Sequence, residues 1–147
     1  MDFLMASFAL LQHERLDIYH EFCRRLAPRL VAVNVGDESA TLTFSRRRVD
    51  RVPALRQPDI EALTDVGTVL DVIDARATLM EAILNDRLFL RGSTEDLLAF
   101  HDGLMAYVHG AVRAPSFPWL LAEFRAAARH RRARAESQRA EPCGRKA

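Results

Sequence analysis

Apolar residues recur at helical spacing along the first 27 residues of the chain. Their intervals of three, four or seven residues predict one long helix over 2–27. Arg15 interrupts the apolar stripe, and Pro28 ends the helix because the residue before a proline disfavours the α-helical region. The stripe consists of Leu4, Phe8, Leu11, Ile18, Phe22 and Leu26.

β-Branched and alternating residues follow this helix and predict a hairpin. Its strands are expected at 30–35 and 40–44, with turn residues at 36–39 between them. The basic segment 46–58 contains two prolines, so it is expected to form an edge strand or a loop. A further short strand is predicted at 59–63.

Two short helices and a strand are predicted next. The helices are expected near 66–73 and 77–85, and Thr64 or Asp65 can cap the first of them. The strand at 87–91 has polar ends and an apolar centre.

A long helix is predicted from 94 to about 112. Ser93 occupies its N-cap position, and Asp96 stands at the reciprocal capping position. The apolar surface is wider than a simple seam and needs cover on two sides, such as a sheet and a ligand. It consists of Leu97, Phe100, Leu104, Met105, Tyr107, Val108 and Val112. After a turn, a last helix is predicted over 119–134, with disorder beyond 136.

The segment that joins the second short helix to the long helix contains a motif. A strand of basic and apolar residues ends in glycine, and a small polar residue then begins a helix. The matching residues are Arg87, Leu88, Leu90, Arg91, Gly92 and Ser93. The motif resembles that of the sterol carrier protein type-2 family of lipid-binding domains, and the resemblance covers roughly 10–125. Asp86 stands where the family usually has glycine, but Asn85 or Asp86 can still make the turn.

This resemblance implies an α/β (α+β) fold with a single twisted, mostly antiparallel sheet of about five strands and helices packed on one face. A long N-terminal helix and a C-terminal helix complete it. The domain is expected at 1–125, followed by a basic helical extension and disordered tail at 126–147. In the family an apolar tunnel between sheet and helices holds a fatty acyl chain, sterol or isoprenoid lipid. The expected ligand-binding residues are Leu79, Ile83, Phe89, Phe100, Leu104, Val108, Phe117, Trp119 and Leu120, the last three as a lid.

The composition of the chain limits the number of domains and the cellular compartment that we expect. The 147 residues suit one domain. The net charge of +1 conceals an uneven distribution of charge along the chain. From Arg125 onward the chain carries eight basic and two acidic side chains, whereas the preceding residues carry thirteen and eighteen. Cys23 and Cys143 show neither a disulfide framework nor zinc spacing, which favours a reducing, cytoplasmic compartment. No signal peptide or membrane-spanning stretch is predicted.

Two groups of residues invite a chemical role. His13, Asp17 and His20 would share one helical face, but no second cluster completes a metal site, so a solvated polar face is expected. His101 lies beside Asp102, yet adjacent helical residues diverge by about 100°, so a partly buried histidine with one hydrogen bond is expected. No catalytic residue, metal or cofactor is therefore predicted.

Three functions follow from these observations. The first is non-enzymatic binding, transfer or presentation of a hydrophobic ligand. The second is an accessory or scaffold protein of a lipid or quinone biosynthetic complex, with a filled core. The third is a small enzyme that uses His101 or Tyr107.

The basic segments of the chain also limit the kinds of partner that we expect. Arg46, Arg47, Arg48 and the basic tail suit a protein partner or an anionic membrane surface. Nucleic acid is disfavoured because these segments lack interleaved aromatic residues. The sequence does not decide whether the protein forms a homodimer.

Overall fold

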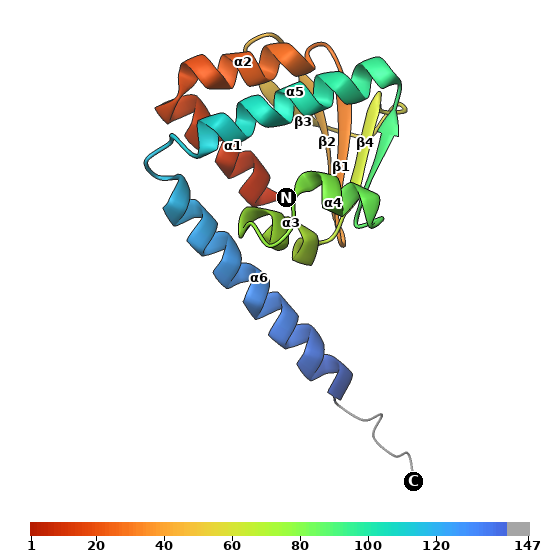
Figure 1. Ribbon diagram of the computed structural model, residues 1–147, viewed down its shortest axis with the longest axis vertical. Coiled ribbons are helices and arrows are strands. Elements are labelled where there is room, and N and C mark those ends of the chain that lie inside the picture. Colours follow the sequence, from red (N-terminus) through yellow and green to blue (C-terminus); the bar gives the residue numbers. More distant parts are fainter. Residues whose placement is uncertain (141–147) are drawn as a thin grey trace.

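The computed structural model describes residues 1–140, in which six helices pack against a five-stranded sheet (Figure 1). The helices are α1 (Asp2–Glu14), α2 (Leu16–Leu26), α3 (Val66–Ile73), α4 (Leu79–Leu84), α5 (Thr94–Ala111) and α6 (Phe117–Ala140). The strands are β1 (Leu30–Val35), β2 (Glu38–Phe44), β3 (Val49–Val52), β4 (Ile60–Thr64) and β5 (Leu88–Gly92). The elements predicted between residues 30 and 112 are all confirmed, with shifts of a few residues at their ends.

The strands lie in the order β3-β2-β1-β4-β5. β1 and β4 are parallel and the other neighbours are antiparallel, so the prediction of a mostly antiparallel sheet is confirmed. The proline-containing segment contributes the edge strand β3, and Pro53 and Pro58 lie outside it. This placement avoids the ladder hydrogen bond that a proline cannot donate.

The prediction of one continuous helix over 2–27 is wrong. The chain leaves the helical region at Arg15 (φ −141°, ψ 62°), which separates α1 from α2. In one straight helix Phe8 and Phe22 would lie about 21 Å apart, at 1.5 Å per residue. Their ring centroids are 5.2 Å apart, because α1 folds back and buries both rings in the same core.

Close contact of α5 with α1 and α2 depends on two glycines of α5. A Cβ atom on Gly103 would lie 2.8 Å from Cγ of Leu26. A Cβ atom on Gly110 would overlap the side chain of Leu11. Gly103 and Gly110 therefore mark the side of α5 that faces α1 and α2.

Local signals explain the connections around α3, α4 and α5. The side chain of Asp65 accepts from the backbone N–H of Thr68, and Thr78 forms a capping box at α4. Ser93 caps α5 as predicted. The turn before β5 uses Asp86 in the left-handed region (φ 55°), which confirms that aspartate can replace glycine there.

The last helix is longer than predicted. α6 begins at Phe117 rather than 119, because the carboxylate of Glu14 accepts the backbone N–H of Ser116 at 3.0 Å and fixes the entry to the helix. It continues to Ala140, so disorder does not begin at 136 as expected. The predicted domain boundary at 125 stays a prediction, and residues 141–147, with Cys143, lie outside the described residues.

None of the helices within residues 1–140 combines the length and the apolar character needed to cross a bilayer.

Candidate functional site

The two halves of the helix-covered sheet face differ in how well they are filled. Beneath α1 and α2 the core is closed, and its members are Phe8, Leu11, Tyr19, Phe22, Cys23, Leu26, Val31, Ala40, Leu42, Phe44, Val49 and Ile60. In α3 and α4, by contrast, the only described buried residues are Thr68 and Ala82. Apart from Ala82, the apolar side chains of these two helices are half-buried or exposed. Apolar surface therefore stays uncovered on this half.

α5 borders the same uncovered region. Phe100, Leu104 and Val108 follow one another at four-residue intervals, so they form a stripe along one side of the helix. That side lies about 60–140° around the helix from Gly103, which faces α2. Phe100 and Leu104 are half-buried, Phe100 packs against the closed core, and Val108 is 41% exposed.

β5 contributes side chains that the sequence analysis did not select. Leu90 lies opposite Ala62 of β4, which shares the helix-covered face with the buried Ile60. Side chains alternate along a strand, so Leu88 and Leu90 face the helices and Phe89 faces the other side. Phe89 is 55% exposed there, so the expectation that it lines a space between sheet and helices is wrong.

The three residues expected to form a lid differ in their surroundings. Phe117 is buried, with its ring 6.1 Å from that of Tyr107, and Leu120 is also buried. Both belong to the packed junction between α6 and the body. Trp119 is 66% exposed, and the C-terminal end of α6 extends beyond the body (Figure 1). No lid is formed by this segment in the described chain.

The remaining residues lie on neighbouring elements, because α4 and α5 both pack on β5, and we treat them as one candidate ligand-binding surface. We call it the open apolar side: Leu79, Ile83, Leu88, Leu90, Phe100, Leu104 and Val108. Five of these seven are among the nine residues expected from the sequence. The other two, Leu88 and Leu90, belong to the motif that carried the resemblance, but their facing became clear only from the pairing of β5 with β4.

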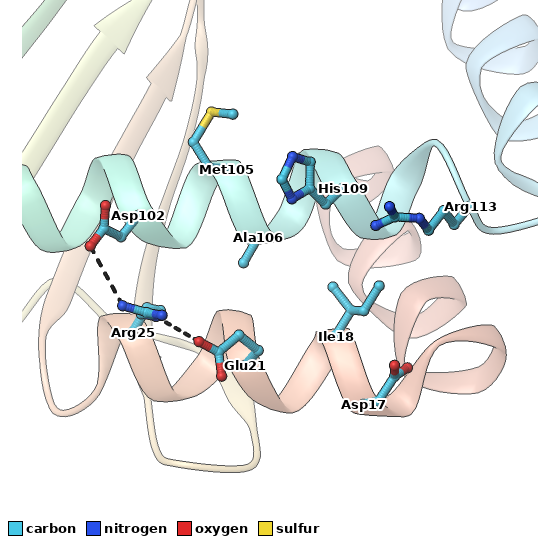
Figure 2. Close-up of a pocket in the computed structure, with 9 residues that line it drawn as sticks. All are labelled: Asp17, Ile18, Glu21, Arg25, Asp102, Met105, Ala106, His109 and Arg113. Carbon is cyan, nitrogen blue, oxygen red and sulfur yellow. Dashed lines mark hydrogen bonds and ion pairs between the residues drawn. The ribbon is translucent and has the colours of Figure 1, made fainter.

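A hollow of about 500 Å³ lies elsewhere, between α2 and α5 (Figure 2). Figure 2 shows Ile18 and Ala106 facing each other between the two helices. Nε of Arg25 donates to Glu21 at 2.6 Å, and its Nη1 lies 3.6 Å from a carboxylate oxygen of Asp102. None of the nine expected residues lines this hollow, and three of its charged residues, Glu21, Arg25 and Asp102, already pair with one another.

The acid–base candidates are poorly placed for catalysis. The side chain of His101 is 60% exposed rather than partly buried, and its Nδ1 lies 3.4 Å from a carboxylate oxygen of Asp102. Tyr107 is half-buried, and its hydroxyl donates to Oγ of Ser7 at 2.9 Å. Burial raises the pKa of Tyr107 to about 12, so this phenol stays protonated near neutral pH.

The other reactive groups are structural. His13 lies on α1 whereas Asp17 and His20 lie on α2, so the break at Arg15 destroys the spacing considered for a metal. No cluster of three metal-ligating side chains occurs in the part of the chain that the structure describes. Cys23 is fully buried, and burial raises the pKa of its thiol to about 11.

Comparison with known proteins identifies the fold. No model of a protein family matches the sequence, and no curated protein matches it. A solved structure described as "UbiJ-SCP2 Ubiquinone synthesis protein" is 21% identical over 67% of this chain and 85% of its own, with a TM-score of 0.51. A crystal structure of sterol carrier protein 2 is 15% identical over 74% and 92% of the two chains, also with a TM-score of 0.51. The chain therefore has the sterol carrier protein 2 fold, as the motif around β5 implied.

Proposed function

We propose that this protein binds, transfers or presents a hydrophobic ligand at the open apolar side without transforming it chemically. The observation that carries the proposal is the contrast between a closed core under α1 and α2 and half-buried apolar residues on α3, α4, α5 and β5. A fold that can bury residues such as Leu11 completely leaves this second set in contact with solvent. An apolar ligand would remove that surface from water.

The energetics suit a long lipid. Burial of each methylene group contributes about 0.8 kcal/mol, so a fatty acyl chain, sterol or isoprenoid offers on the order of 10 kcal/mol before ordering costs. No charged anchor is needed, which agrees with the apolar character of the open apolar side. Specificity would then depend on the shape of the site.

The proposal includes a non-enzymatic role and a cytoplasmic compartment. His101 is exposed, and the hydroxyl of Tyr107 donates to Ser7, so neither side chain is held in a position to act as an acid or base on a bound ligand. A reducing, cytoplasmic setting suits the buried free thiol of Cys23.

Lipid extraction tests the proposal. Purified protein should release an acyl, sterol or isoprenoid lipid on denaturing extraction, and native mass spectrometry should show the matching complex. Leu104→Gln, which places an amide in the open apolar side, should abolish this complex. Leu98→Gln is the matched control, because Leu98 is exposed on another side of α5 and its change should leave the complex intact. If no lipid is carried, and no acyl chain or sterol raises the melting temperature, the proposal fails.

A second function is favoured by one observation. One of the structural neighbours is described as a ubiquinone synthesis protein, so an accessory role in a quinone or lipid biosynthetic complex is the alternative. In that case the open apolar side would contact a protein, and a homodimer or larger assembly would form. Native mass spectrometry separates the two, since a protein subunit and a lipid differ greatly in mass. Loss of a protein complex, rather than a lipid complex, in Leu104→Gln would favour the alternative.

A further inference from the structure

α6 has an outward face whose chemistry differs from the rest of the surface. Phe117 and Phe124 point to the body, where the ring of Phe124 lies 5.2 Å from that of Phe3. Trp119 lies roughly 150° around the helix from both phenylalanines, and it is 66% exposed. The outward face therefore begins with an exposed tryptophan.

Basic residues continue this outward face. Arg129, His130 and Arg134 lie within about 80° of Trp119 around the helix axis, and all three are exposed. No ion pair of these three occurs among the described residues. α6 as a whole carries six arginines and two glutamates, so its net charge is +4. We call Trp119, Arg129, His130 and Arg134 the outer face of α6.

Two other arginines explain why this face is turned outward. Nε of Arg125 donates to Asp74 at 2.9 Å, and Arg131 pairs with Glu38. These two arginines lie on opposite flanks of α6, about 120° on either side of Trp119. The acidic body thus holds the helix by its flanks and leaves the outer face free.

We propose that the outer face of α6 docks the protein on an anionic phospholipid surface. The inference rests on the proposed function, because a carrier must meet a membrane to exchange its lipid. A basic helix with an exposed tryptophan is typical of elements that lie in the lipid headgroup region. The arginines would be attracted to the anionic headgroups, and the indole ring of Trp119 would enter the membrane interface.

The second basic segment is a poorer candidate for this surface. Nε of Arg48 donates to Asp50 at 2.6 Å, and Arg51 donates to the backbone oxygen of Ser39. Arg46 and Arg47 remain, beyond the Phe44 end of β2. Glu38, which holds α6, begins that strand, so the two basic regions are separated by about 20 Å of strand.

Trp119 reports on the proposal directly, because it is the only tryptophan of the chain. With vesicles of phosphatidylglycerol and phosphatidylcholine in equal parts, its fluorescence should shift to the blue and the protein should co-sediment. Pure phosphatidylcholine vesicles should produce neither effect, and high salt should reverse both.

Charge reversal separates the two basic regions. Arg129→Glu with Arg134→Glu should weaken vesicle binding by at least about tenfold. Arg46→Glu with Arg47→Glu is the matched control and should change it less than twofold. Circular dichroism checks that both variants are folded, and lipid extraction checks that both still carry ligand.

Three results would overturn the inference. They are equal binding to both vesicle types, loss of binding in the Arg46 and Arg47 variant alone, and binding to an oligonucleotide without any binding to vesicles. None of them would affect the proposed ligand site, which lipid extraction tests separately.

Discussion

The packing of α1 against α5 can be tested by adding one methyl group at Gly110. A Cβ atom there would overlap the side chain of Leu11 and lie 3.0 Å from Cγ2 of Ile18. Leu11 is 0% exposed, so it cannot move into solvent to relieve the overlap. Overpacking of this kind costs about 1–3 kcal/mol. Alanine gains about 1 kcal/mol over glycine in a helix, so Gly110→Ala should lower the free energy of unfolding by up to about 2 kcal/mol.

The sign should reverse when Leu11 is shortened. Leu11→Ala alone should cost about 2–5 kcal/mol, because it leaves a cavity. In that background the overlapping atoms are gone, so Gly110→Ala should be neutral or stabilising by up to about 1 kcal/mol. The double-mutant cycle should therefore give a coupling of about 1–3 kcal/mol in urea denaturation followed by circular dichroism.

A matched glycine provides the control for this cycle. Gly103→Ala would meet Leu26 instead of Leu11, so it should add to Leu11→Ala without coupling. If Gly110→Ala and Leu11→Ala were additive within about 0.5 kcal/mol, the contact between α1 and α5 would be refuted.

Three further changes have defined outcomes. Cys23 should resist alkylation at pH 8 until denaturant is added, because its pKa is raised to about 11 and it is buried; mass spectrometry of its peptide measures this. Asp86→Gly should raise the free energy of unfolding by about 0.5–1 kcal/mol in urea denaturation, whereas Asp86→Val should lower it, because φ is 55°. The Ser93 hydroxyl and the Arg29 guanidinium lower the pKa of Asp96, so its stabilising effect is present at neutral pH and lost on acidification. Asp96→Asn should therefore flatten the fall in melting temperature below about pH 5.

Most of the fold from β1 to α5 could be predicted because its signals are local. Asp65 and Ser93 cap their helices through hydrogen bonds to residues three positions away. Asp86 makes its turn with its own backbone. Each of these depends on a short stretch of chain, so a single sequence contains the information.

The features that were missed depend on contacts between distant segments. Arg15 is neither glycine nor proline, and only the contact of Phe8 with Phe22 shows why the first helix breaks there. Leu88, Phe89 and Leu90 are all apolar, so alternation alone does not show which of them face the helices. Pairing with β4 decides it, and a shift of one residue reverses every side chain.

The direction of α6 was equally hidden from sequence reasoning. Its first turn has apolar residues that suit a lid, and Phe117 does pack against the body. The ion pairs of Arg125 with Asp74 and of Arg131 with Glu38 join residues 51 and 93 positions apart. Such pairs set the course of the helix and leave no pattern in the sequence near α6.

The central claim is that an apolar ligand binds at the open apolar side, and methyl NMR tests it most directly. Titration with a fatty acid should shift the methyl signals of Ile83, Leu104 and Val108. The signals of Leu11 and Leu42, in the closed core, should move much less. Saturable shifts confined to the first group would support the account. Absence of saturable shifts at Ile83, Leu104 and Val108, with sterol and isoprenoid lipids tested in the same way, would contradict it.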